Sequence, residues 1–378
     1  MAAEVSLGAI VRSAGVAYVR TQKTSSIQRK VLRAVAACRT PALGGHRDRC
    51  DRCQFEHMLW HSCRNRHCPR CQALARARWL DARSDELLPV PYFHVVFTVP
   101  DLLNEIALVA PKLFYELLFR AVGRTLVEIA DSRLHASIGV LAVLHTWGQT
   151  LSLHPHIHCV VPGGGFSTTR NRWLGVRKRT FFLPVKVLSR RFRTIFCNAL
   201  RDAWKQGQLK ALSERFADRT AFELFLSQCC RKDWVVYSKA PFGGPKQVLA
   251  YLAAYTHRIA ISNRRILSFE NDRVRFAYRD YRTRQQKVME LSSSEFLRRF
   301  LLHVLPSRFV RIRYYGFLAN RHRKASLEQA RSLITTTAPP QPSAPRPAAA
   351  SRLCPTCGLG VMVVIELVAP DISYWNDS

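Results

Sequence analysis

Acidic residues are scarce in this sequence, with 26 Asp and Glu against 58 Lys and Arg in 378 residues. Lysine is scarce as well, because only 12 of the basic residues are Lys and 46 are Arg. The formal net charge of +32 opposes compaction by self-repulsion, which favours a polyanionic partner. Arginine suits phosphate in particular, because guanidinium binds it bidentately and also stacks on bases. The composition therefore favours a nucleic-acid-binding protein over a basic protein without such a partner.

Long apolar runs are also missing. No uncharged apolar run reaches the ~20 residues that a membrane-spanning helix needs. Residues 1–17 lack the basic start, apolar run and small-residue cleavage site of a signal peptide. We therefore expect a cytoplasmic protein. A reducing compartment keeps thiols free, so the 12 cysteines indicate metal binding rather than disulfides.

Pattern and composition divide the chain into five segments. Residues 1–37 carry apolar positions at helical spacing, whereas 38–88 are rich in Cys, His and Arg and poor in aliphatic residues. That second composition cannot build a hydrophobic core, so it indicates a metal-organised module. Residues 89–334 alternate predicted strands and helices. A Pro- and Ala-rich linker, 335–350, precedes a tail, 351–378.

Four cysteines in the second segment form a zinc motif. Cys50-x-x-Cys53 and Cys68-x-x-Cys71 are separated by 14 residues. Two-residue spacing lets both thiolates of each pair reach one tetrahedral zinc, and four protein ligands would make the site structural rather than catalytic. Further candidate ligands lie between and beside them: His57, His61, Cys63 and His67.

The tail carries a second, isolated cysteine pair, Cys354-x-x-Cys357. It is half of a zinc knuckle with no partner pair nearby. Three interpretations stay open: metal binding with a second chain, ligands shared with another part of this chain, or no role.

The zinc module is also rich in arginine. Six arginines close to its cysteines in sequence favour a phosphate-contacting surface over a merely solvated basic face. They are Arg47, Arg49, Arg52, Arg64, Arg66 and Arg70.

A histidine cluster is predicted in the third segment. His156 and His158 must point to one face of the strand 156–161, and Ile157 to the other, where it can enter a core. His145 ends the preceding apolar strand and can lie beside the pair if the two strands are antiparallel. Three histidines with open positions can hold a divalent ion for Lewis-acid chemistry. Gln149 and His154 are lesser candidates, and a structural role is the alternative for His145.

Two tyrosines supply a candidate nucleophile. Tyr251 and Tyr255 are four apart in helix-favouring sequence and share one face, and Arg258, Arg264 and Arg265 follow. Core packing is the ordinary role of such a pair. A free tyrosine, with a pKa near ~10, is a poor nucleophile at neutral pH. It can attack a phosphodiester if a metal polarises the phosphoryl oxygen and cations neutralise the developing charge. Two tyrosines would allow two covalent DNA links in succession.

The chain resembles the rolling-circle insertion-sequence transposases of the HUH two-tyrosine class, the IS91 type. The resemblance covers nearly all of residues 25–325. Its motifs are Ser62-Cys-Arg-Asn-Arg-His-Cys-Pro-Arg-Cys-Gln72, Phe93-His-Val-Val-Phe-Thr-Val-Pro100, His145-Thr-Trp-Gly-Gln149 leading into His154-Pro-His-Ile-His158, and Tyr251-Leu-Ala-Ala-Tyr255 with Arg258 and Ile261-Ser-Asn263.

The resemblance implies an α+β protein. A small zinc-binding domain would precede an HUH endonuclease domain with a central antiparallel sheet flanked by helices. Mg²⁺ or Mn²⁺ would be held by His156 and His158 with a third ligand, for which His145 is our choice. Tyr251 and Tyr255 would cut single-stranded DNA and leave a 5′-phosphotyrosine and a free 3′-OH. The DNA would be the element's own ends, which can form hairpins, and the target; in a bacterial cell the protein would associate with the nucleoid when bound to DNA.

Two other classes of function are alternatives to transposition. A plasmid replication initiator or a conjugative relaxase uses the same chemistry, but the zinc module disfavours both. A non-catalytic zinc-containing DNA-binding protein would need neither tyrosine. A transposase that depends on three carboxylates is disfavoured, because the 26 acidic residues show no catalytic setting.

Overall fold

The computed structural model describes residues 5–176, 182–212, 214–216, 218–239, 247, 253, 260–280, 282–334 and 353–371. The chain divides into two compact units that do not follow its linear order. Unit 1 comprises Met1–Ala75, Ile261–Val304 and Thr337–Ser378, and unit 2 comprises Arg76–Ala260 and Leu305–Thr336. The segment boundaries expected from composition stay predictions.

Unit 2 is built on a seven-stranded antiparallel sheet in the described part of the chain. Its order is β7-β6-β4-β5-β3-β8, and β12 also pairs with β4. The strands are β3 (Tyr92–Thr98), β4 (Ser137–Trp147), β5 (Leu153–Pro162), β6 (Gly164–Phe166), β7 (Trp173–Gly175), β8 (Val236–Lys239) and β12 (Ile312–Gly316). The helices are α4 (Asn104–Val109), α5 (Pro111–Leu134), α6 (Val185–Lys205), α7 (Arg219–Cys229) and α10 (Arg323–Leu333), with short 3-10 turns η2 (Asp101–Leu103) and η3 (Lys210–Leu212). Helix α3 (Pro69–Ser84) begins in unit 1 and ends in unit 2.

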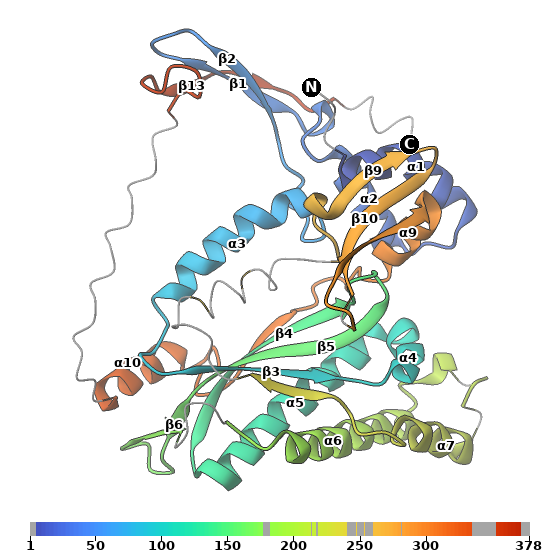
Figure 1. The fold of residues 1–378 in the computed structure, drawn as a ribbon, viewed down its shortest axis with the longest axis vertical. Helices are drawn as coiled ribbons and strands as arrows, with labels where there is room; N and C mark the ends of the chain where they lie inside the picture. The colour runs from blue at the N-terminus through green and yellow to red at the C-terminus, as the bar shows by residue number, and fades with distance from the viewer. Residues whose placement is uncertain are drawn as a thin grey trace. The chain divides into compact units, whose positions relative to one another are not determined.

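The core of unit 2 lies between one face of this sheet and helices α5 and α6, which run along it (Figure 1). Alternation along the strands sends Phe97, Leu144 and Ile157 into that core, where each is at most 1% exposed. The break between α4 and α5 falls just before Pro111. α4 ends at Val109, and a proline fits the first turn of α5, where its missing N–H group is not needed.

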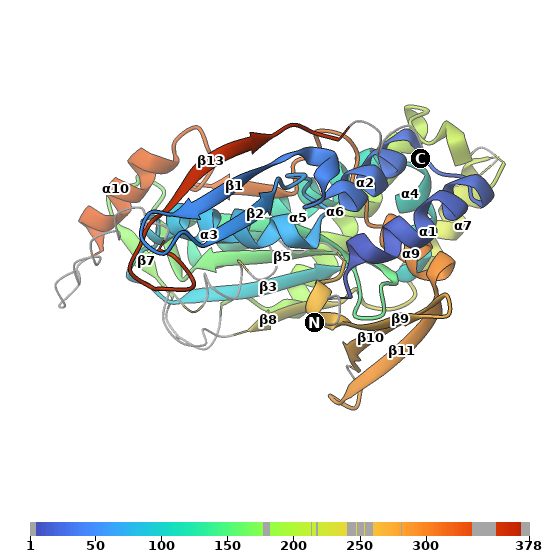
Figure 2. The ribbon, with the colours of Figure 1, turned by 90° about the horizontal axis from the view of Figure 1, so that it is seen from above.

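Unit 1 combines a helical pair with two small sheets. Its described elements are α1 (Leu7–Thr21), α2 (Ser26–Ala37), η1 (Pro41–Leu43), β1 (Gly45–Cys50), β2 (Glu56–Trp60), η4 (Asn263–Arg265), β9 (Ile266–Glu270), β10 (Arg273–Arg279), β11 (Gln286–Ser292), α9 (Ser293–Leu301) and β13 (Met362–Val368). One sheet has the order β13-β1-β2, so β13, from the C-terminal part of the chain, lies beside β1 (Figure 2). The other has the order β11-β10-β9.

Local sequence explains the starts and turns of these elements. Ser25 caps α2 in a capping box with Gln28, which satisfies two N–H groups at the start of the helix. β9 and β10 form a hairpin around Asn271 and Asp272, and both residues have positive φ (48° and 59°), as a tight hairpin turn requires. Ser292 caps α9, because its side chain accepts from the N–H group of Glu295.

The predicted α+β class, with a central antiparallel sheet flanked by helices, is confirmed. None of the described helices combines the length and apolar character needed to cross a bilayer. Tyr251 and Tyr255, which the sequence places in a helix-favouring stretch, lie outside the described residues.

Candidate catalytic site and metal centres

Three histidines of unit 2 converge on one face of the sheet. β4 and β5 pair antiparallel with His145 directly opposite His156, and His158 follows two positions along β5. Period-two alternation therefore puts all three imidazoles on the face opposite the α5–α6 core. One ring nitrogen from each lies within 4.8 Å of those from the other two. The structure thus brings together the three histidines that the sequence predicted to meet, and we call them the histidine cluster.

Neighbouring groups orient two of the rings. His156 Nδ1 lies 2.6 Å from the carbonyl oxygen of His154, so it donates there and Nε2 is the nitrogen that can bind a metal. His158 Nδ1 lies 2.8 Å from His94 Nε2, and the two rings are stacked with their planes 9° apart. Hydrogen bonds to the second nitrogen are how metal-binding histidines are held in the correct tautomer. His94 was missed from the sequence, where one histidine on a strand gives no distinctive signal.

Burial keeps two members of the cluster, His156 and His158, neutral at physiological pH. The side chains of His145 and His158 are buried, and His156 is half-buried. Removal from water lowers the pKa of His156 to about 4 and that of His158 well below its usual 6.5, because burial disfavours the charged form. For the same reason, reinforced by Lys239, the pKa of His94 falls to about 4. Neutral imidazoles present lone pairs, so this site is prepared for a cation.

The remaining predicted residues of the active site divide into those outside and those inside the described part of the chain. Tyr251, Tyr255 and Arg258 lie outside the described residues. Arg264 is described and exposed. The neighbouring Arg265 has a structural role, because its Nε donates to the carbonyl oxygen of Ala277 at 2.8 Å.

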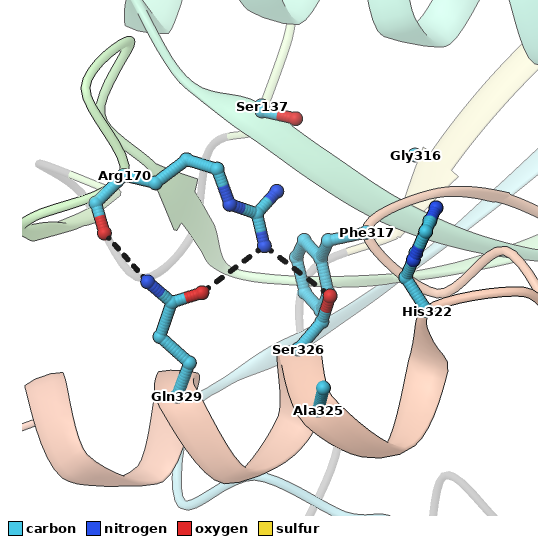
Figure 3. Close-up of a pocket in the computed structure, with 8 residues that line it drawn as sticks. All are labelled: Ser137, Arg170, Gly316, Phe317, His322, Ala325, Ser326 and Gln329. Carbon is cyan, nitrogen blue, oxygen red and sulfur yellow. Dashed lines mark hydrogen bonds between the residues drawn. The ribbon is translucent and has the colours of Figure 1, made fainter.

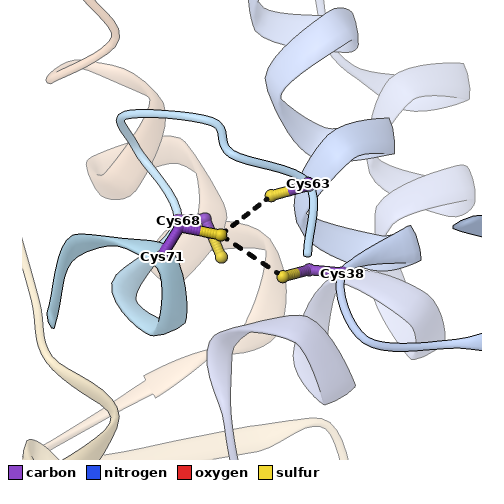
Figure 4. Close-up of side chains that lie close together, drawn as sticks. All are labelled: Cys38, Cys63, Cys68 and Cys71. Atoms are coloured by element: carbon purple, nitrogen blue, oxygen red, sulfur yellow. Dashed lines mark hydrogen bonds between the residues drawn. The ribbon is translucent and has the colours of Figure 1, made fainter. Parts of the chain in front are cut away.

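The predicted zinc ligand set of Cys50, Cys53, Cys68 and Cys71 is corrected by the structure. These residues belong to two different clusters within unit 1. Cys68 and Cys71 join Cys38 and Cys63, and all four sulfurs lie within 4.8 Å of one another (Figure 4). We call this set the N-terminal cysteine cluster.

The second set, Cys50, Cys53, Cys354 and Cys357, also has its four sulfurs within 4.8 Å of one another, and we call it the joint cysteine cluster. The physical reason for the correction is strand pairing. β1 ends at Cys50 and pairs with β13, which brings the tail pair to the Cys50–Cys53 turn. Of the three interpretations of the tail pair, sharing ligands with another part of the chain matches the structure.

The arginines of the zinc module are not equivalent. Arg47 and Arg49 both form ion pairs with Glu56, at 3.5 and 2.6 Å, so their charge is partly balanced within the sheet. Three others carry the predicted DNA-contacting surface and are exposed or half-buried: Arg64, Arg66 and Arg70. Burial lowers the pKa of Arg66, although a guanidinium stays charged at neutral pH.

A cavity of about 430 Å³ lies elsewhere in unit 2, between α10 and the loop that follows β6 (Figure 3). Its one arginine, Arg170, donates to Ser326 Oγ and Gln329 Oε1, both at 3.2 Å, and lies over the ring of Phe166. These contacts tie the loop to α10. The guanidinium therefore serves packing, and the histidine cluster stays the better candidate for chemistry.

Comparisons with known proteins agree with this geometry. Residues 139–326 match the family described as "Putative transposase", and residues 10–99 match "Transposase zinc-binding domain". "Putative transposase y4qJ" of Sinorhizobium fredii is 50% identical over 376 residues, which cover 95% of this chain and 94% of the relative. "Transposase for insertion sequence element IS801" of Pseudomonas savastanoi pv. phaseolicola is 29% identical over 316 residues, which cover 78% of this chain and 71% of the relative.

Among solved structures, a conjugative relaxase TRWC in complex with oriT DNA is similar to this chain. The match covers 43% of this chain and 68% of the relaxase chain. The sequence identity is 11% and the TM-score is 0.22, which is too low to establish a shared fold.

Proposed function

Because this chain belongs to the IS91-type family of transposases with an N-terminal zinc-binding domain, we propose that it mobilises its own insertion sequence by nicking single-stranded DNA through a tyrosine nucleophile and a histidine-held divalent ion. The observation that carries this proposal is the convergence of His145, His156 and His158 on one face of the sheet. A transposase breaks and rejoins phosphodiester bonds. Among the sites in the described part of the chain, the histidine cluster is the one whose side chains suit that chemistry.

The donor set fits a divalent cation. Three imidazoles, two of them oriented through their second nitrogen, form a ligand set with open coordination positions. We propose Mg²⁺ or Mn²⁺ as the ion, with its open coordination positions filled by oxygen atoms of water and of the DNA phosphate. When bound, the ion would act as a Lewis acid on the phosphoryl oxygen.

The covalent step conserves the bond energy of the DNA. The phenolic oxygen of Tyr251 or Tyr255 attacks the phosphorus and forms a P–O bond, while the bond from phosphorus to the 3′ oxygen breaks. The phenolic proton is lost, and the departing 3′ oxygen takes up a proton to become a 3′-OH. The second tyrosine can repeat the reaction on another strand, so cutting at one site and transfer to another can be coupled.

Recognition of DNA is assigned to the basic surface of unit 1. Arg64, Arg66 and Arg70 surround the N-terminal cysteine cluster, which we propose binds a structural zinc. Four protein ligands close such a site, so the zinc would organise the module and leave chemistry to the histidines. This surface would bind the DNA ends of the element, including the hairpins that they form, and the target DNA.

The first prediction is a covalent adduct. Wild-type protein incubated with a labelled single-stranded oligonucleotide from the end of the element and Mn²⁺ should give a labelled protein band that survives denaturation. A chelator should prevent its formation, because the nucleophile needs the metal. If wild type forms no adduct with Mn²⁺ or Mg²⁺, the proposed function is wrong.

The second prediction concerns His94 as a positioning residue. His94→Phe keeps an aromatic ring beside His158 but removes the nitrogen that contacts Nδ1. Loss of such an outer contact costs about 10–100-fold in metal affinity. We therefore expect the Mn²⁺ concentration for half-maximal adduct formation to rise by about that factor, with little change at saturating Mn²⁺.

Two variants control this experiment. His94→Gln, which can still hydrogen-bond, should restore part of the affinity, and His322→Gln at an exposed position should leave the Mn²⁺ dependence unchanged. If saturating Mn²⁺ does not restore adduct formation in His94→Phe, His94 does not act by positioning His158 for the metal.

A further inference from the structure

The joint cysteine cluster brings together cysteines from the N-terminal part and the C-terminal part of the described chain. Cys50 is the last residue of β1 and Cys53 follows in the next turn, whereas Cys354 and Cys357 precede β13, some 300 residues later in the sequence. We propose that these four cysteines bind a second structural zinc, and that the C-terminal segment 353–371 is thereby an integral part of the zinc-binding domain. The family match to that domain ends at residue 99, so it leaves this segment out.

The sulfur positions match a zinc tetrahedron. Cys50 Sγ and Cys357 Sγ are 3.7 Å apart, and Cys53 Sγ and Cys354 Sγ are 3.6 Å apart. Zn–S bonds of about 2.3 Å at tetrahedral angles place neighbouring sulfurs about 3.8 Å from each other. A disulfide would require about 2.05 Å. The spacing is therefore that of four thiolates around one ion.

Backbone N–H groups point at these sulfurs from both turns. The N–H groups of Arg52 and Cys53 lie 3.4 Å from Cys50 Sγ. On the tail side, the N–H of Thr356 lies 3.4 Å from Cys354 Sγ, and that of Gly360 lies 3.3 Å from Cys357 Sγ. Such donors stabilise negative charge on an acceptor, so both turns are shaped for thiolates rather than thiols.

Gly360 permits the close approach of the two turns. A Cβ atom at this position would lie 2.3 Å from Cys50 Sγ, closer than any van der Waals contact. Asp51 then holds the turns together, because its Oδ1 accepts from the N–H of Val361 at 2.8 Å and its own N–H donates to the carbonyl oxygen of Val361 at 3.1 Å. The sequence between the tail cysteines and β13 is thus built to fit against Cys50.

The sheet that these turns join has little apolar burial of its own. β13 exposes most of its residues, including Val363, Val364, Ile365 and Leu367. A small sheet without a buried face is marginal in water, and a structural metal is a common substitute for a core. Zinc at the joint cluster would supply the stability that holds β13 on β1.

The test is zinc stoichiometry in the full-length chain. Metal analysis of wild type should find two zinc ions per chain, and the Cys354→Ser, Cys357→Ser double variant should retain one. Hydrogen exchange should accelerate in β13 and β1 of that variant, while the amides of β4 and β5 in unit 2 keep their protection and report that the chain is folded. The Cys38→Ser, Cys63→Ser variant should also lose one zinc.

Further variants separate metal binding from general damage. Cys354→His should keep two zinc ions, because His replaces Cys in structural sites. Gly360→Val, which keeps all four cysteines, should lose the second zinc because its side chain meets Cys50. Cys230 is half-buried in unit 2 and belongs to neither cysteine cluster, so the control Cys230→Ser should keep two. One zinc in wild type, two in Cys354→Ser, Cys357→Ser, or a disulfide among these cysteines in the purified protein would each overturn the proposal.

Discussion

Replacing His156 and His158 together with alanine should slow formation of the covalent DNA adduct by at least ~10³-fold. Two of the three imidazoles that lie within 4.8 Å of one another would be lost, so the site could no longer hold a divalent ion. Lewis-acid catalysis lowers a barrier by several kcal/mol, and each 1.36 kcal/mol is a factor of ten in rate. The measurement is the initial rate of adduct formation with labelled single-stranded DNA at saturating Mn²⁺.

Ile157 provides a matched control for the histidine variant. It lies between the two histidines but faces the α5–α6 core, where it is fully buried. Ile157→Val should cost about 0.5–1.5 kcal/mol in the free energy of unfolding and leave the rate at saturating Mn²⁺ unchanged. DNA binding by the double histidine variant, followed by gel shift, should persist because the basic surface is untouched. A double variant that forms adduct at the wild-type rate would exclude the histidine cluster as the catalytic metal site.

Strand periodicity is why the histidine cluster could be predicted from sequence. Because side chains alternate along a strand, His156 and His158 share one face and Ile157 lies on the other. The apolar strand before them can pair with theirs, which places His145 beside the two histidines. The role of His94 depends on the register of β3 against β5, which no local pattern encodes. Its contact with His158 became visible only in the folded sheet.

The cysteine clusters show the limit of spacing as evidence. A two-residue interval identifies two ligands of one ion but carries no information about which other pair completes the tetrahedron. Cys38, at the end of α2, has no cysteine near it in sequence and was missed. Cys354 and Cys357 reach Cys50 through pairing of β13 with β1, a tertiary contact between segments that are far apart in sequence. Another tertiary contact, between α1 and α9, joins residues 261–304 to the N-terminal unit.

Replacing Tyr251 and Tyr255 together with phenylalanine should abolish the adduct, and we expect no labelled protein band above background. Phenylalanine keeps the ring and its packing but has no oxygen to attack phosphorus, so neither covalent link can form. Noncovalent DNA binding and the zinc content should match those of wild type. The measurement is the same denaturing assay, extended to long times at saturating Mn²⁺, with each single variant beside the double one.

Tyr237 is the matched control for the tyrosine variant. It pairs with Val96 of β3, which in turn pairs with His158, so Tyr237 belongs to the same face of the sheet as the histidine cluster and is exposed there. Tyr237→Phe should leave adduct formation unchanged. If the adduct persists in the Tyr251→Phe, Tyr255→Phe variant and disappears in Tyr237→Phe, the nucleophile lies on β8 and the assignment to residues 251 and 255 is wrong. If each single variant at 251 and 255 retains adduct while the double one does not, both tyrosines can attack, as two successive strand transfers require.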